Sequence, residues 1–363
     1  MMKRLSLILF LSLNIFATNH YVTTTGAGTK DSSSWANAWS LSEFVSNVES
    51  DGDGNSYYFK SGTYTLIEDL DVGTNRNYIN FIGVKSATTA EPPTVDDWAY
   101  GDDRPLFVCG SYKFRPSGDY PSFRLFANLI FTSSYTGHIA GKQRTFFFNV
   151  KMTQSSTDSS VSCAYISNGL ILSCEFINSN GIGVALGSGG AIINSFIHDC
   201  NNGIKGANGG DIVANTIVSG CTTGYYSGDW WAPAFLNHVT FYDCTTAINL
   251  NVYLAHSLSN ILIDNCSTGI SSGSIGAPLK IIMNNVNFNS VSTKYDTSDV
   301  WDLNNSELDP QFKDADNQNF EPQNLNLIGE AFPNTFVGTN TTNKNVAGAC
   351  QVVRKASSTA RLY

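Results

Sequence analysis

The feature of this sequence that limits its fold most strongly is a repeat of about 22 residues, marked by an asparagine at nearly fixed spacing. From Asn128 to Asn260 the spacings are 21, 24, 21, 21, 22 and 23 residues, with Ser173 in one asparagine place and a degraded last copy at Asn284 or Asn285. A period of this length predicts a stack of similar units, each contacting its neighbours. The copies read FANLIFTSS, FFNVKMTQSS, ILSCEFINSNGIG, IINSFIHDCNNGI, VANTIVSGCTTGY, FLNHVTFYDCTTAI, LSNILIDNCSTGI and IMNNVNF.

Each copy contains short apolar alternations broken by Asn and Gly, so its local period is two and it predicts β-strands. Three short strands and three bends fit into one copy. A leucine-rich repeat of similar length would need a Leu-x-x-Leu-x-Leu signature, which is absent. We therefore predict an all-β fold, a single-stranded right-handed parallel β-helix whose coils stack about 4.8 Å apart.

Two columns of side chains follow from this stacking. An asparagine at each bend tolerates the left-handed backbone, and its amide can bond to the asparagine one coil away. Cys200, Cys221, Cys244 and Cys266 come six or seven residues after their asparagines and form a second column. Parallel Cβ vectors keep neighbouring Cβ atoms about 4.8 Å apart, beyond the usual disulfide distance of about 3.5–4.5 Å, so we predict a buried stack of free thiols.

The other cysteines, Cys109, Cys163, Cys174 and Cys350, stay open from sequence, with a disulfide between Cys163 and Cys174 as one candidate. Metal binding by cysteine would need converging pairs at CxxC-like spacing, and the chain has none. The sequence therefore predicts no metal site made of cysteines.

The chain begins with MMKRLSLILFLSLNIFAT, in which two basic residues precede an apolar run too short to cross a bilayer, and this predicts a signal peptide over residues 1–18 and a secreted, extracellular protein. Residues 19–56 are predicted to form an N-terminal cap with a short amphipathic helix that includes Trp35, Trp39 and Phe44. The parallel β-helix is predicted over 57–295, and a C-terminal cap or tail over 296–363.

The charge balance restricts the partners. The chain has 30 acidic against 21 basic residues, a net charge of −9, which argues against a nucleic-acid or anionic-membrane partner. Beyond the predicted signal peptide, no stretch is apolar enough for a membrane helix.

The stretches YVTTTGAGTKDSSSWANAW and FKSGTY, the coils, and a tail reading DPQF…F…P…GACQ together resemble pectate-lyase-like right-handed parallel β-helix repeat proteins, secreted or phage-encoded. The resemblance covers nearly all of the chain after the signal peptide. It implies the β-helix fold and carbohydrate association, but no single reaction, because the fold hosts lyases, hydrolases, epimerases, tailspikes and adhesins.

The motifs that polygalacturonases of this fold carry, Asn-Thr-Asp, Gly-His-Gly and Arg-Ile-Lys, are absent here, which argues against a hydrolase of that type. A lyase would need calcium ligands beside a base. Asp199 and Asp243 share a column, but they lie two coils or about 9.6 Å apart, with Gly220 between them. We therefore predict no cofactor, because no calcium ligand cluster is recognisable.

Catalytic candidates on or near the coils are Asp199, Lys205, Asp229 and His238, although solvated polar residues on an outer face would look the same. The stretch TTGYYSGDWWAPAF is more informative, because flat aromatic rings stack on sugar rings. It predicts carbohydrate contacts at Tyr225, Tyr226, Trp230 and Trp231, with a lateral loop cover or a subunit contact as the alternative.

The sequence thus predicts a protein that binds, and in one reading cleaves, an extracellular polysaccharide or cell-surface glycan along its lateral face. Two alternatives remain: a non-enzymatic adhesin or tailspike-like protein, and a purely structural rod. The adhesin reading favours a homotrimer, and otherwise we expect a monomer.

Overall fold

The computed structural model describes residues 18–48, 54–71, 78–115, 123–135, 143–156, 158–206, 209–228, 233–250, 255–272, 280–296, 300–303, 305–324 and 327. The chain folds as an all-β parallel solenoid of about nine turns. It divides into two compact units, a first unit of Met1–Tyr135 with Ile139–Met152 and Lys355–Tyr363, and a second unit of Thr136–His138 with Thr153–Arg354. We describe each unit by itself.

In the first unit, β1, β2, β5, β8 and β10 pair in parallel in that order, and β3, β6 and β9 pair beside them. The elements are β1 (Asn19–Val22), η1 (Trp35–Asn37), α2 (Leu41–Val48), β2 (Asn55–Lys60), β3 (Thr63–Thr65), β4 (Leu70–Asp71), β5 (Tyr78–Val84), η2 (Val95–Asp97), η3 (Gly101–Asp103), β6 (Leu106–Gly110), β7 (Phe114–Arg115), β8 (Phe123–Ala127), β9 (Ile130–Ser133) and β10 (Thr145–Phe148), followed by β11 (Lys151–Gln154).

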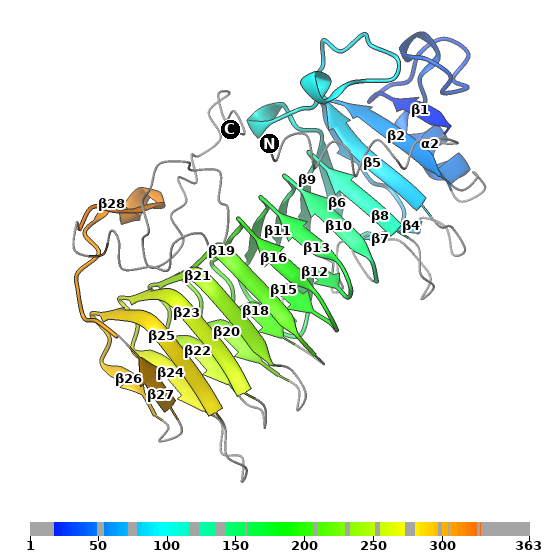
Figure 1. Ribbon diagram of the computed structural model, residues 1–363. Helices are drawn as coiled ribbons and strands as arrows, with labels where there is room; N and C mark the ends of the chain where they lie inside the picture. Colours follow the sequence, from blue (N-terminus) through cyan, green and yellow to red (C-terminus); the bar gives the residue numbers. More distant parts are fainter. Residues whose placement is uncertain are drawn as a thin grey trace. The chain divides into compact units, whose positions relative to one another are not determined.

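In the second unit, each coil adds one strand to a seven-stranded parallel sheet and then one or two strands to a large parallel sheet. The seven strands are β12 (Ser162–Ile166), β15 (Ile182–Leu186), β18 (Asn202–Gly206), β20 (Thr223–Ser227), β22 (Thr246–Leu250), β24 (Thr268–Ser272) and β26 (Thr293–Tyr295). Those of the large sheet are β13 (Leu170–Leu172), β14 (Glu175–Asn178), β16 (Ala191–Ile193), β17 (Phe196–His198), β19 (Asp211–Ser219), β21 (Ala234–Tyr242), β23 (Ala255–Asp264), β25 (Lys280–Asn289) and β27 (Val300–Leu303). Figure 1 shows β19, β21, β23 and β25 side by side, as their pairing requires.

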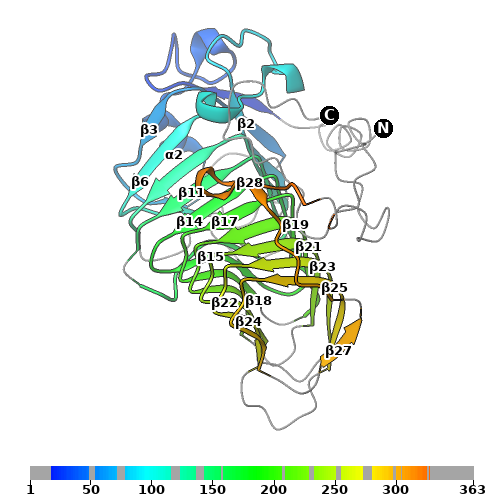
Figure 2. The ribbon, with the colours of Figure 1, turned by 90° about the vertical axis from the view of Figure 1, so that its left-hand side faces the viewer.

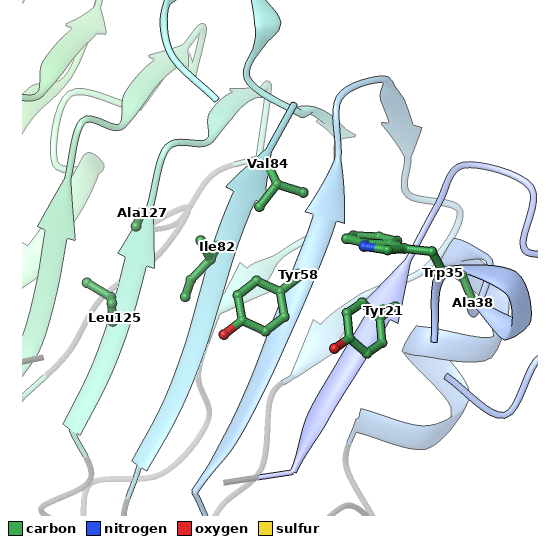
Figure 3. Close-up of a cluster of buried hydrophobic side chains, with 8 residues drawn as sticks. All are labelled: Tyr21, Trp35, Ala38, Tyr58, Ile82, Val84, Leu125 and Ala127. Carbon is green, nitrogen blue, oxygen red and sulfur yellow. The ribbon is translucent and has the colours of Figure 1, made fainter. Parts of the chain in front are cut away.

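The core of the first unit is aromatic inside the coils. Rings at matching positions of neighbouring strands stack along the solenoid, with Phe81 and Phe126 at 4.9 Å and Phe126 and Phe147 at 5.2 Å between centroids. A second cluster lies on the outer side of the same strands, where Trp35 packs against Tyr21 at 4.8 Å (Figure 3). The cluster contains Tyr21, Trp35, Ala38, Tyr58, Ile82, Val84, Leu125 and Ala127. Apolar burial on both sides of the sheet therefore stabilises these coils.

The predicted N-terminal helix is shorter than its apolar pattern suggested. Trp35 begins a 3-10 turn, Trp39 forms an isolated bridge with Val22, and the α-helix itself begins at Leu41. Phe44 of α2 contacts Tyr57 of β2 at 5.3 Å. The periodicity misled because both tryptophans are buried by tertiary contacts rather than along one helical face.

The predicted asparagine column is confirmed. Asn149 donates its amide to Asn128 at 2.8 Å in the first unit, and Asn215 donates to Asn194 at 2.9 Å in the second. These hydrogen bonds run from one coil to the next and keep the bonded bends in register. The column positions with left-handed backbone are Asn128, Asn149, Ser173, Asn194, Asn215, Asn260 and Asn285.

One member of that column departs from the prediction in its backbone alone, since the Asn237 side chain accepts from the Asn260 amide at 3.0 Å. His238, not Asn237, takes the left-handed conformation at φ 52°, because Ala214 pairs with Asn237 and Thr216 with Val239. The Nδ1 atom of His238 is buried and has no hydrogen-bond partner among the described residues. Burial lowers the pKa of His238.

We expect His238→Asn to raise the free energy of unfolding by about 1 kcal/mol, because it removes a buried nitrogen without a partner and supplies an amide to the column. Urea unfolding followed by circular dichroism measures the change. His238→Gln is the matched control, since it has the same amide on a longer side chain. A neutral or destabilising His238→Asn would mean that the buried Nδ1 atom of His238 does not weaken the fold.

The cysteine prediction is confirmed for the described members of the column. Cys200, Cys221, Cys244 and Cys266 are buried and free, and each thiol donates to the carbonyl two residues earlier. Hydrogen bonds between neighbouring thiols and burial raise the pKa of Cys266. The candidate disulfide is wrong, because Cys163 and Cys174 are both free. Cys109 is free and buried as well, and Cys350 lies outside the described residues.

The C-terminal segment returns over the large sheet. Its hairpin consists of β28 (Phe312–Asp314), η4 (Ala315–Asn317) and β29 (Asn319–Pro322). Phe320 packs with Phe196 and Ile217, and Tyr242 and Phe312 complete this cluster. Figure 2 shows β28 beside β17 and β19. The described part of this segment therefore covers the outer face of the large sheet near β17, β19 and β21.

Candidate functional site

The seven-stranded sheet carries two columns of outward side chains, set by its strand register. The threonine column begins at Asn202 of β18 and continues through threonines of the next strands, and most of its members are partly exposed. The lysine column runs three residues further along the same strands. In the threonine column stand Asn202, Thr223, Thr246, Thr268 and Thr293, and in the lysine column Tyr165, Ala185, Lys205, Tyr226, Asn249 and Ser271.

Lys205 is the distinctive residue of this face. Two other lysines of the second unit form ion pairs, Lys294 with Glu307 and Lys313 with Glu321. In the part of the chain that the structure describes, the Lys205 amine has neither an ion-pair nor a hydrogen-bond partner. A partly exposed ammonium without a carboxylate keeps its charge available to a ligand.

Tyr226 lies beside Lys205 in the sheet register, and both side chains approach the backbone of Gly228. A Cβ atom added at Gly228 would lie 2.9 Å from Cε of Lys205 and 3.0 Å from Cε1 of Tyr226. The glycine thus allows the lysine stem and the tyrosine ring to lie together at the end of their strands. An aromatic ring next to a cation can contact both the apolar face and a polar group of one sugar.

Tyr225 does not belong to this face. The structure places it inside the coil with 0% exposure, where its hydroxyl lies 3.4 Å from Asp211 Oδ2, so the predicted carbohydrate contact is wrong. Burial, and then the nearby Asp211, hold the pKa of Tyr225 well above its usual range. Asp229, Trp230 and Trp231 lie outside the described residues. On the strand that follows them, Phe235 is 49% exposed.

The four catalytic candidates do not form one site among the described residues. Lys205 lies within β18, Asp199 at the bend before that strand, and His238 at the bend inside β21, whereas Asp229 is not described. The Asp199 carboxylate contacts Nδ1 of His198 at 2.8 Å, and Glu175 contacts Nε2 of the same ring at 3.3 Å. His198 itself is buried and stacks on Phe196 at 4.2 Å. Asp199 therefore binds a neighbouring side chain rather than facing Lys205.

The predicted column of Asp199, Gly220, Asp243 and Asn265 exists, and each of these residues has a left-handed backbone. Asp243 accepts a hydrogen bond from Asn265 at 3.0 Å. Across the described ranges, no group of three or more His, Cys, Asp or Glu side chains is arranged to hold a metal ion. No helix among the described residues is long and apolar enough to cross a membrane.

The threonine column was not predicted from the sequence. The signal was available, since CTTGY, CTTAI and CSTGI place a threonine two residues after three of the four column cysteines. A hydroxyl that recurs on every coil of an exposed face is both a donor and an acceptor, like the hydroxyls of a sugar.

No family model matches the sequence, and no curated protein matches it. Among solved structures, pectate lyase Pel9A is similar, with a TM-score of 0.55 at 13% identity over 93% of this chain and 97% of that chain. An endo-xylogalacturonan hydrolase from Aspergillus tubingensis has a TM-score of 0.40 at 14% identity, covering 80% and 92%. The PL6 family alginate lyase AlyGC has 0.39 at 11%, covering 93% and 59%. This chain therefore has the pectate-lyase-like parallel β-helix fold.

Proposed function

We propose that this protein is exported and binds a polysaccharide along the exposed face of the seven-stranded sheet. The observation that carries the proposal is Lys205, an ammonium without a partner among the described residues, which lies beside Tyr226 at the start of a row of neutral polar side chains. Neighbouring strands are about 4.8 Å apart, which is comparable to the length of one pyranose residue. An extended glycan that runs across the strands would therefore meet one set of side chains per sugar.

The bound partner is a glycan rather than an apolar surface, because the face offers few large apolar groups. The columns combine hydroxyl, amide, phenol and ammonium groups, which suit many hydroxyls along a polymer. The described C-terminal hairpin packs on the large sheet. The proposed binding face belongs to the other, seven-stranded sheet.

Affinity gel electrophoresis of residues 19–363 in neutral and acidic polysaccharides tests the proposal, with retardation as the supporting result. The same polymers are then followed for chain shortening and for the ultraviolet absorbance of unsaturated uronates. Absorbing ends would extend the function to a lyase, and shortening without them to a hydrolase. Binding without turnover by a trimer would favour an adhesin or spike, and no binding would favour a structural rod.

We expect Lys205→Met to weaken retention about tenfold, because a hydrogen bond to a charged group contributes about 1.5 kcal/mol. Lys30→Met is the matched control, since Lys30 pairs with Glu43 at 3.1 Å in the first unit. Tyr226→Ala is expected to weaken retention by a smaller factor, with exposed Tyr112→Ala as its control. Equal retention of Lys205→Met and the natural protein would remove this face from the site.

A further inference from the structure

We infer that the ligand is a largely neutral polysaccharide that carries isolated carboxylates, and that Lys205 selects one of them. This inference rests on the proposed function, since it names the kind of glycan that binds the same face. It depends on how charge is distributed over the face and along its edge.

Lys205 is the one cation among the described residues of the two columns, and the exposed carboxylate just beyond β26, Asp296, accepts from the Ser272 N–H at 2.8 Å. Lys205 is the charged member of the lysine column, and the threonine column consists of Asn202 and four threonines. A polyuronate lying across the strands would place a carboxylate on every sugar, one for each coil or nearly so. All but one of these carboxylates would meet a neutral side chain, such as the methyl group of Ala185 or the amide of Asn249, which cannot replace the hydration of an anion as an ammonium does.

The edge of the face is acidic. Asp199 and Asp243 lie at the bends that precede β18 and β22, three residues before Asn202 and Thr246 of the threonine column. Both carboxylates are exposed. The Asp199 carboxylate lies next to His198, whereas the Asp243 carboxylate accepts a hydrogen bond from the neutral amide of Asn265. Together with the net charge of −9, these groups repel a dense polyanion more than a sparsely charged chain.

Lys205 and Tyr226 give the isolated acidic sugar a specific place. The ring of Tyr226 can take the apolar face of a pyranose, and the neighbouring ammonium can take its carboxylate. On β20 and β22, the hydroxyls of Thr223 and Thr246 and the amide of Asn249 suit neutral sugars, whereas the neighbour of Lys205 on β15 is Ala185. A single cation within a neutral row thus fixes the register of the polymer.

The test uses two graded series on different backbones. One is a galacturonan whose carboxylates are methyl-esterified to increasing degree, and the other is a glucan carboxymethylated to increasing degree. We expect the strongest retention of the natural protein on the sparsely charged members of each series, about tenfold above the fully charged and fully neutral members. Lys205→Met should bind the sparse and the neutral members equally, whereas Lys30→Met should behave like the natural protein.

Asp243→Asn gives an independent readout of the acidic edge. Asparagine keeps the left-handed bend and the size of the side chain, so we expect this variant to bind the fully charged polymers two- to threefold more strongly while binding of the neutral polymers stays unchanged. Retention that rises steadily with carboxylate density would overturn the inference and leave polysaccharide binding intact. No retention on either series would overturn the proposed function, and the inference with it.

Discussion

Replacing Asn260 by leucine is expected to lower the free energy of unfolding by about 4 kcal/mol. Asn260 is fully buried and left-handed at φ 56°, donates to Asn237 at 3.0 Å and accepts from Asn285 at 3.0 Å. Leucine removes these hydrogen bonds, leaves the Asn285 amide buried without this acceptor, and adds a cost of roughly 1–2 kcal/mol because, unlike asparagine, it does not tolerate the left-handed backbone. Urea unfolding followed by far-ultraviolet circular dichroism measures the loss.

Asn260→Gly separates the two causes, because glycine accepts the left-handed backbone but supplies no amide. We expect it to lose about half as much stability as the leucine variant. A leucine variant within about 0.5 kcal/mol of the natural protein would show that the asparagine column contributes little, since ordinary surface substitutions have effects of that size.

Acidification is expected to destabilise the fold through His256. This ring is 1% exposed, its Nδ1 accepts from the Ala234 backbone N–H at 3.1 Å, and burial lowers the pKa of His256 to about 4. Unfolding returns the ring to an ordinary pKa of about 6.5, so the unfolded chain binds more protons between these values. Stability should therefore be unaffected above pH of about 6.5 and fall by about 3 kcal/mol as the pH drops to about 4.

Urea unfolding at a series of pH values tests this expectation. His256→Gln keeps an acceptor for the Ala234 N–H but does not titrate, so its stability should depend less steeply on pH across the same window. The His238→Asn variant serves as the control, because it removes a different buried histidine whose pKa is also lowered. Parallel curves for the natural protein and His256→Gln would contradict the assignment to His256.

The coil architecture could be predicted from sequence because each coil repeats the same local requirements. Asparagine at a left-handed bend and cysteine six or seven residues later are positions where backbone conformation and burial restrict the residue type, and both columns are confirmed. The Asn237 amide joins the column through Asn260, but the bend itself was assigned to Asn237 wrongly, because Asn237 and His238 are adjacent and both tolerate that bend. Only the pairing of Ala214 with Asn237 shows which of them occupies it.

The candidate site was predicted less well, because alternation alone does not say which of two adjacent tyrosines points inward. Gly224 and Tyr225 are both buried, and a Cβ atom added at Gly224 would lie 2.5 Å from the ring of Phe241. Two consecutive inward residues shift the phase of the strand, so that Tyr226 points outward. The free state of the Lys205 amine could not be predicted either, since it depends on where the carboxylates of other coils lie.

The regular repetition of the coils allows a protein of this kind to gain or lose whole coils over evolutionary time. Because every bend repeats the bend before it and contacts only its neighbours, duplication or loss of one coil's worth of coding sequence would leave the remaining coils intact. The seven-stranded sheet would grow or shrink in steps of about 4.8 Å. A lineage could thus match the length of its binding face to a longer or shorter glycan by unequal recombination, without a new core.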